Sequence, residues 1–140
     1  MTENEIGTII VNTAIEVHRQ LGPGLLESVY EKILEYELSS NGLAVQRQVP
    51  IHITYKSMTF DEAFRADLLV ADKVIIELKS VEFLSNAHRK QVQTYLRLTG
   101  LKLGYLLNFG TALMKDGIVR SVNHLEDSPL PLRVSASSRE

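Results

Sequence analysis

The pattern of hydrophobic and polar positions divides the chain into a helical first third and a mixed remainder. Apolar residues recur at helical spacing over about residues 3–20 and again over about 25–40, which predicts two amphipathic helices. Thr2 and Glu5 have the spacing of a capping box at the start of the first helix. The Gly22-Pro23-Gly24 segment separates the two helices because it favours a turn.

From about residue 43 the period changes to two, which predicts strands. The first strand is predicted over 43–55, and Pro50 within it indicates an edge position or a bulge. The second is predicted over 58–70 and should present one apolar face made of Phe60, Phe64, Ala66, Leu68 and Val70. A third strand, almost wholly apolar, is predicted over 74–79.

The last third of the chain returns to alternating elements. A helix is predicted over about 86–99, followed by a buried strand over 103–109. A weaker hairpin is predicted around Asp116-Gly117, with residues 118–122 as its second arm. The order α-α-β-β-β-α-β-β predicts an α/β sandwich, with a central mixed sheet flanked by helices.

Composition narrows the class of protein. With 140 residues, of which 44% are hydrophobic and 23% charged, the chain suits one domain, predicted over 1–125, with a flexible C-terminal tail over 126–140. No apolar run approaches the roughly 18 residues of a membrane span, so we expect a cytoplasmic protein. The formal net charge of −2 argues against a protein that coats nucleic acid, although an acidic metal site would itself lower the charge of a nuclease.

The third predicted strand ends on residues that a buried strand does not need. Glu77 and Lys79 lie two positions apart, so their side chains emerge on the same face, where burial is costly if the site is dry. If residues 71–73 form the turn, Asp67 lies opposite Glu77, and the two carboxylates repel. A hard divalent cation such as Mg²⁺ would remove that repulsion. The alternatives are a plain ion pair at the end of the sheet, or a one-residue slip that separates the acids.

Three residues of the first two helices are further candidates. Glu27, in the first turn of the second helix, is either a helix-start carboxylate favoured by the dipole or a third carboxylate for the metal. Tyr30 is either a core residue or a contact to a base or sugar. His18 ends the first helix, where a cation suits the dipole, and is an additional candidate for the site.

The later helix carries a polar stripe. Gln91 and Tyr95 are spaced i and i+4, and His88 lies one turn earlier, so all three share a face. This pattern indicates either a helix that faces a wet cleft or an amphipathic boundary stripe.

Taken together, these residues resemble the GxxExxY proteins. The segment Gly24 to Tyr30 matches the motif that names the family. The resemblance spans about residues 5–125 and continues through Arg65-Ala66-Asp67, Glu77-Leu78-Lys79, and Gln91 with Tyr95. The family is placed in the PD-(D/E)XK nuclease superfamily, whose RecB-type members are nearest in pattern. Ala66 stands where the superfamily pattern has proline.

The resemblance implies a restriction-endonuclease-like fold and a nuclease that uses Mg²⁺ or Mn²⁺ to hydrolyse phosphodiesters, with DNA favoured over RNA. It places the metal on Glu27, Asp67, Glu77 and the Leu78 carbonyl. Lys79 would orient or deprotonate the attacking water, and Gln91 would complete the catalytic set. The residues expected to contact the substrate are Tyr30, Arg65, His88, Gln91 and Tyr95. Some relatives bind an iron–sulfur cluster, which the absence of cysteine excludes here.

Other functions stay open on the sequence. A catalytically inactive nucleic-acid- or protein-binding domain on the same fold would bind without turnover and with little metal requirement. An adaptor acting through the apolar face of the first helix would bind a protein and no nucleic acid. The acid–lysine set favours the enzyme, because a pure binder has no need of clustered acids that repel phosphates. A homodimer is one way for so small a core to hold a duplex.

Overall fold

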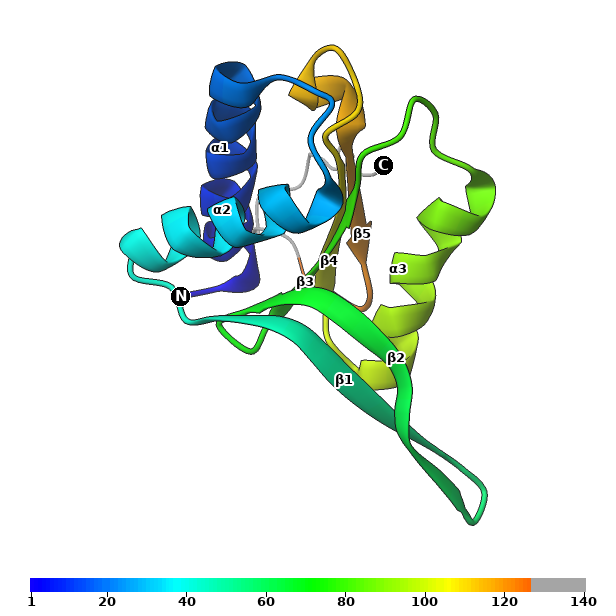
Figure 1. Ribbon diagram of the computed structural model, residues 1–140. Helices are drawn as coiled ribbons and strands as arrows, with labels where there is room; N and C mark the ends of the chain where they lie inside the picture. The colour runs from blue at the N-terminus through cyan, green and yellow to red at the C-terminus, as the bar shows by residue number, and fades with distance from the viewer. Residues whose placement is uncertain (127–140) are drawn as a thin grey trace.

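A five-stranded mixed sheet with helices on both faces forms the fold, as the sequence predicted (Figure 1). The computed structural model describes residues 1–126, so the tail predicted for 126–140 lies outside the described residues except for Glu126. The elements, in chain order, are α1 (Glu3–Leu21), α2 (Glu27–Ser40), β1 (Val45–Tyr55), β2 (Met58–Val70), β3 (Val74–Lys79), α3 (Asn86–Thr99), β4 (Leu103–Asn108), the 3₁₀ helix η1 (Met114–Gly117) and β5 (Ile118–Val122).

The strands lie in the order β1-β2-β3-β4-β5. Only β3 and β4 run parallel among these pairs, with α3 as the crossover between them, and the other neighbours are antiparallel. Pro50 lies on the edge strand β1, beside a register shift between Ile51 and Ile53. Both devices anticipated for a proline within a strand are therefore present.

Local signals fix the helix ends. The capping box of Thr2 and Glu5 is formed at the start of α1, and α3 begins with a second one between Ser85 and His88. Gly100 ends α3 in the left-handed conformation with φ 78°. Within residues 1–126, no helix is long and apolar enough to span a bilayer.

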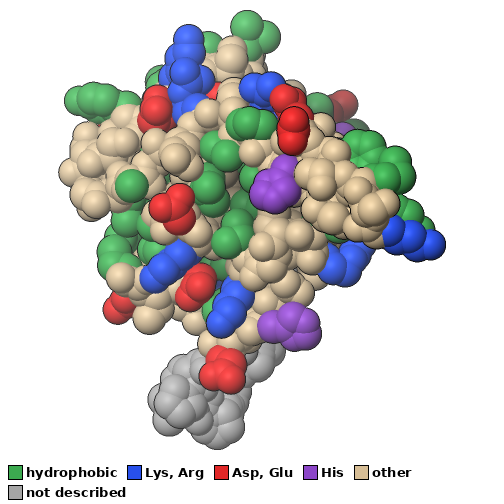
Figure 2. All heavy atoms as spheres, turned by 90° about the horizontal axis from the view of Figure 1, so that it is seen from below, with side chains coloured by type: hydrophobic (Ala, Val, Ile, Leu, Met, Phe, Trp, Pro, Cys, Tyr) green, Lys and Arg blue, Asp and Glu red, His purple; other side chains and the backbone are tan. Residues whose placement is uncertain are grey.

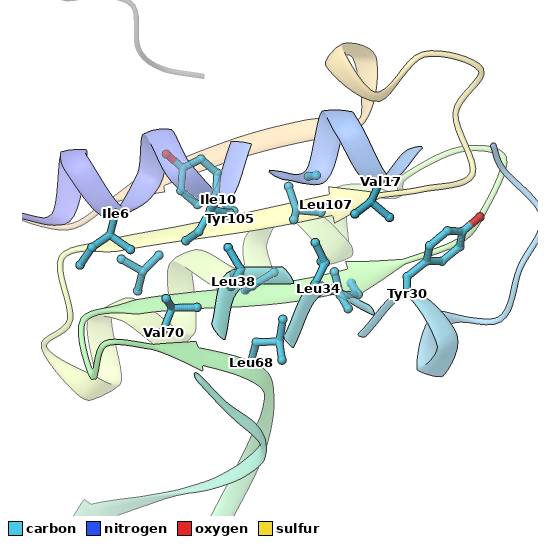
Figure 3. Packing of buried hydrophobic residues seen from close by; sticks show 14 of the residues in the cluster. Ile6, Ile10, Val17, Tyr30, Leu34, Leu38, Leu68, Val70, Tyr105 and Leu107 are labelled. Atoms are coloured by element: carbon cyan, nitrogen blue, oxygen red, sulfur yellow. The ribbon is translucent and has the colours of Figure 1, made fainter. Parts of the chain in front are cut away.

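Two apolar clusters cover the two faces of the sheet. The larger joins α1 and α2 to β2, β3 and β4, and Figure 3 shows its side chains meeting between the helices and the strands. The smaller lies beneath α3, where Val92, Tyr95 and Leu96 pack on Ala66, Ile75 and Leu106. The central strands β3 and β4 are thus buried on both faces of the sheet.

The apolar face predicted for β2 is divided between the two clusters, which corrects the sequence prediction. Leu68 and Val70 pack in the larger cluster, whereas Ala66 belongs to the smaller one and Phe64 packs against it. Strict alternation assumes a flat strand. Here the strand changes face at Asp67, where its ladder with β3 ends and the β1–β2 ribbon twists away from the sheet (Figure 1).

The connection from β4 to β5 also differs from the prediction. Asp116-Gly117 does not form a tight two-residue turn between strands but closes η1. The strand before it ends at Asn108 rather than Phe109, and residues 109–117 form a longer connection. β5 itself spans Ile118–Val122, as predicted.

Candidate active site

Asp67 and Glu77 meet where the ladder between β2 and β3 ends. Val70 pairs with Val74 and Leu68 with Ile76, so the two acids are the next step of that register. Each carboxylate there accepts a main-chain N–H from the opposite strand. The Asp67 amide donates to Glu77 Oε2 at 3.0 Å, and the Leu78 amide donates to Asp67 Oδ2 at 2.8 Å. The two side chains are therefore oriented by the backbone that carries them.

Burial raises the pKa of both carboxyl groups in the free protein. Desolvation, and then the neighbouring charge of Asp67, raise the pKa of Glu77 to about 8. Desolvation also raises the pKa of Asp67, against the lowering effect of the Leu78 hydrogen bond. Glu77 therefore holds a proton that a bound cation would displace.

Lys79 ends β3 on the same face as Glu77, and its charge acts to lower the pKa of that acid. The end of β3 is fixed by Asn108, which pairs with Lys79 across the parallel ladder. The Asn108 side chain bonds both main-chain polar groups of Val81, at 3.0 Å each. The sequence prediction did not include Asn108. Its only signal in the sequence is an amide side chain at the end of an apolar strand.

Glu27 comes to the same end of β3 from α2. It is the first residue of that helix, and its Oε2 accepts the Ser80 amide at 3.2 Å. The Ser80 hydroxyl donates to the Leu25 carbonyl at 2.9 Å and thereby ties the loop before α2 to the end of β3. The Glu27 side chain is exposed.

Gln91 and Tyr95 lie on the opposite flank, on α3. The Gln91 amide donates to the Tyr95 hydroxyl, and the Tyr95 ring stacks on Phe64 with centroids 3.7 Å apart. The negative charges of Glu77 and Asp67, after desolvation, raise the pKa of Tyr95.

Comparison with known proteins shows the family to which the chain belongs. A family model described as the PD-(D/E)XK nuclease superfamily matches residues 4–121. The chain belongs to the PD-(D/E)XK nuclease superfamily. No curated protein matched the chain. Among solved structures, it is similar to the crystal structure of SSO0001, with 23% identity over 72% of this chain and a TM-score of 0.48. The chain spans 52% of the length of that protein.

Membership of the PD-(D/E)XK superfamily suggests a nuclease, and such nucleases typically use divalent metals. The donor chemistry fits such an ion, because a buried carboxylate, Glu77, and a half-buried one, Asp67, both with raised pKa values, lie together near a third carboxylate, Glu27. In residues 1–126, no three acidic or imidazole side chains are arranged as a ready-made metal shell. Side-chain rotation, above all of Glu27, would therefore accompany metal binding.

Two other predicted site residues have structural partners instead. Tyr30 is fully buried in the larger cluster; its ring stacks on Phe109 and its hydroxyl donates to the Gly22 carbonyl. Of the two interpretations of Tyr30, the structure thus supports the core residue. His18 is also buried, with Nε2 against the Thr111 carbonyl at 2.9 Å.

Arg65 and His88 each have a partner close in sequence. Arg65 is exposed and forms a bidentate pair with Glu62 on the same strand. His88 closes the capping box of α3, where its Nδ1 accepts the Ser85 amide at 3.2 Å. Both keep part of their side chains open to solvent.

Three residues beside the candidate site had no signal in the sequence: Glu31, Arg47 and Gln48. Glu31 lies one helical turn after Glu27 and is buried, 5% exposed. Its two oxygens accept from Arg47 and Gln48, each at 2.8 Å. Gln48 also reaches Asp67. On a helical projection Glu31 looks like one more surface acid, and only the approach of β1 buries it.

Proposed function

We propose that this chain is a divalent-metal-dependent nuclease that hydrolyses phosphodiester bonds in DNA. The observation that carries the proposal is the pair formed by the half-buried Asp67 and the buried Glu77, each held by a main-chain amide of the other's strand, with Lys79 on the same face as Glu77. A stable core does not require two facing acids with raised pKa values, because their repulsion lowers stability. Within the PD-(D/E)XK superfamily, such a pair is explained by metal-assisted hydrolysis.

The residues proposed to hold Mg²⁺ or Mn²⁺ are Asp67, Glu77, Glu27 and the carbonyl of Leu78. The Leu78 amide points toward β2, where it meets Asp67, and the carbonyl of a strand residue points to the same edge as its amide. The Leu78 oxygen therefore faces the acids beyond the end of the β2–β3 ladder. When bound, the cation would make a water more acidic and offset charge on the phosphate.

Lys79 is proposed to act on the attacking water. Its ammonium group donates protons and, on the face shared with Glu77, can orient a water or neutralise charge that develops on the phosphate. The Asn108 clamp holds the strand end that carries Lys79. The lysine is thus positioned by main chain that is itself fixed, which favours catalysis.

Gln91 and Tyr95 are proposed to position the nucleic acid strand, with outer contacts from Arg65 and His88. The hydrogen bond from Gln91 to Tyr95 and the stack on Phe64 fix the flank on which a strand would lie. Figure 2 shows acidic and basic side chains interspersed on the face that it presents. The formal net charge of −2 suits contacts to a few phosphates rather than a broad basic coat. Tyr30 is left out, because its ring and hydroxyl are used within the fold.

The test is a calorimetric titration of the protein with Mn²⁺ and Mg²⁺, beside cleavage of labelled single- and double-stranded DNA and RNA. Asp67→Ala should abolish both metal binding and cleavage. Asp61→Ala, an exposed acid farther along β2, is the matched control and should change neither.

Each result distinguishes a different function. Metal binding that is lost only in Asp67→Ala, with DNA cleavage, supports the proposal, whereas cleavage of RNA alone would replace the substrate class. Nucleic-acid binding without metal dependence or turnover would overturn the enzyme in favour of a binding domain on the same fold.

A further inference from the structure

We propose that Gln48 is a positioning residue that aims the Asp67 carboxylate, and that Arg47 and Glu31 hold Gln48 in place. The inference extends the proposed function, since it assigns the residues that set the geometry of the central acid. Neither Gln48 nor Glu31 lies in the acid–lysine motif, and they reach the site from β1 and α2.

The contacts form a chain from the surface to the site. The Arg47 guanidinium donates to Glu31 Oε2 at 2.8 Å and also pairs with Glu35 at 3.1 Å. The Gln48 amide nitrogen donates to Glu31 Oε1 at 2.8 Å and to Asp67 Oδ1 at 3.3 Å. An amide NH₂ has two protons, so a single group can bridge the two carboxylates.

This bridge completes the set of donors around Asp67. Its Oδ2 is held by the Leu78 amide, and Gln48 takes the other oxygen. The negative charge of Glu31 raises the pKa of Asp67, whereas the Gln48 hydrogen bond lowers it. Gln48 thus separates two acids that would otherwise repel, and fixes the plane of the one proposed to bind metal.

The backbone of Gln48 shows what this placement requires. Its φ is 54°, in the left-handed region that side-chain-bearing residues rarely adopt within a strand. The pairing of β1 with β2 runs through Arg47 with Leu68 and Val49 with Ala66, and it skips Gln48 with Asp67. A strained residue persists where its surroundings hold it, and such residues concentrate at functional sites. Here the conformation turns the Gln48 side chain toward α2 and Asp67.

The consequence concerns metal affinity rather than folding. Without the Gln48 amide, the Asp67 carboxylate is free to rotate. No donor then lies between the negative charges of Glu31 and Asp67, so the two carboxylates repel. Outer partners of metal ligands typically contribute about tenfold or more in affinity. We therefore expect Gln48 variants to bind Mn²⁺ about tenfold more weakly while they retain the fold.

The experiment separates side chain from backbone. Gln48→Gly removes the amide and suits the left-handed φ, whereas Gln48→Ala removes the amide and keeps the strain. Lys56→Gly is the matched control: its φ is 55°, in the exposed turn between β1 and β2, away from the acids. The readouts are the Mn²⁺ dissociation constant by calorimetry, the urea midpoint, and the Leu78 amide proton shift in the metal-free protein.

Gln48→Gly and Gln48→Ala should both lose about tenfold in Mn²⁺ affinity and shift the Leu78 resonance, although their urea midpoints differ. Lys56→Gly should change the midpoint alone. Wild-type affinity and an unmoved Leu78 signal in both Gln48 variants would overturn the positioning role. If the wild-type protein binds no Mn²⁺, the proposed function fails, and the Leu78 shift alone then decides whether Gln48 aims Asp67. Should Gln48→Ala not fold, Gln48→Gly, which removes the amide and suits this φ, decides the outcome alone.

Discussion

At the scale of single residues, the candidate site centres on Glu77, an acid that the fold keeps out of water. Glu77 lies between apolar strand residues and beside Asp67, and these surroundings raise its pKa to about 8. Its carboxyl group is therefore largely protonated in the metal-free protein at neutral pH. A metal ion competes with that proton, so metal binding should strengthen as the pH rises.

The metal-free protein should lose stability as the pH rises from about 5 to 8. The pKa of Glu77 is raised in the folded state from its ordinary 4.5 to about 8, so the folded protein holds a proton that the unfolded chain releases. The stability from this group is present below the unfolded pKa and is lost as the pH approaches the folded one. Urea unfolding across this range should show the decline in wild type and a flatter profile in Glu77→Gln. A wild-type curve as flat as that of the variant would contradict the assigned burial.

Replacement of Lys79 by methionine should separate binding from chemistry. Methionine keeps an unbranched side chain but removes the ammonium group, so cleavage should fall by about 10²–10⁴-fold. Metal affinity should be retained or slightly increased, because a neighbouring positive charge has been removed. Single-turnover cleavage and calorimetry measure the two effects. Lys73→Met, at the opposite end of β3, should behave as wild type, and full activity in Lys79→Met would exclude the lysine from catalysis.

At the scale of elements, the start of α2 is set by the loop that precedes it. The Tyr30 hydroxyl donates to the Gly22 carbonyl and accepts the Leu25 amide at 3.3 Å, so the helix closes its own entry loop. Figure 3 shows the Tyr30 hydroxyl at the margin of the cluster, while the ring lies within it. Glu27 is the first residue of the helix, so the closure of this loop also sets the position of the Glu27 side chain.

Tyr30→Phe should therefore destabilise the protein by about 1–2 kcal/mol, because the Gly22 carbonyl and the Leu25 amide each lose a partner. The stack on Phe109 is retained, so the core itself is not emptied. Tyr36→Phe makes the same chemical change at a site that is 69% exposed on the same helix, and should leave stability unchanged. Equal urea midpoints for the two variants would show that the loop closure contributes nothing.

At the scale of the whole molecule, the site depends on the junction between β3 and β4. Asn108 fastens the chain after β3 through both polar groups of Val81, and its Oδ1 also accepts the Gly110 amide at 3.0 Å. Packing there is tight, since a Cβ on Gly110 would lie 2.2 Å from the Val81 oxygen. The end of one strand is thus held by the end of its neighbour, although α3 separates them in sequence.

Asn108→Asp should cost about 2–3 kcal/mol, because it replaces the donor to the Val81 carbonyl by an oxygen and buries a charge. Cleavage should fall as well, since the same segment carries Lys79. Asn12→Asp makes the identical change on an exposed face of α1 and should shift stability by less than about 0.5 kcal/mol. Urea unfolding measures the stability of both variants, and cleavage rates measure their activity. If Asn108→Asp changed neither, the contacts between Asn108 and Val81 would have no part in the mechanism.

Sequence reasoning reached the elements and the central acids but not the residues that hold them. The turn at residues 71–73 set the register of β2 with β3, so Asp67 could be placed beside Glu77. Gln48 offered no such signal, because nothing local announces a left-handed residue inside an alternating strand. Tyr30 was assigned two roles, and only packing against Phe109 distinguished them.

The sequence by itself determined the order of elements, the caps and breaks of the helices, and the kinds of chemical group available, because periodicity and capping act between residues close in the chain. Tertiary structure alone decided that β2 changes face at Asp67, that β1 buries Glu31, and that Asn108 clamps the end of β3. Those outcomes depend on sheet twist and on contacts between distant segments, which no local pattern encodes.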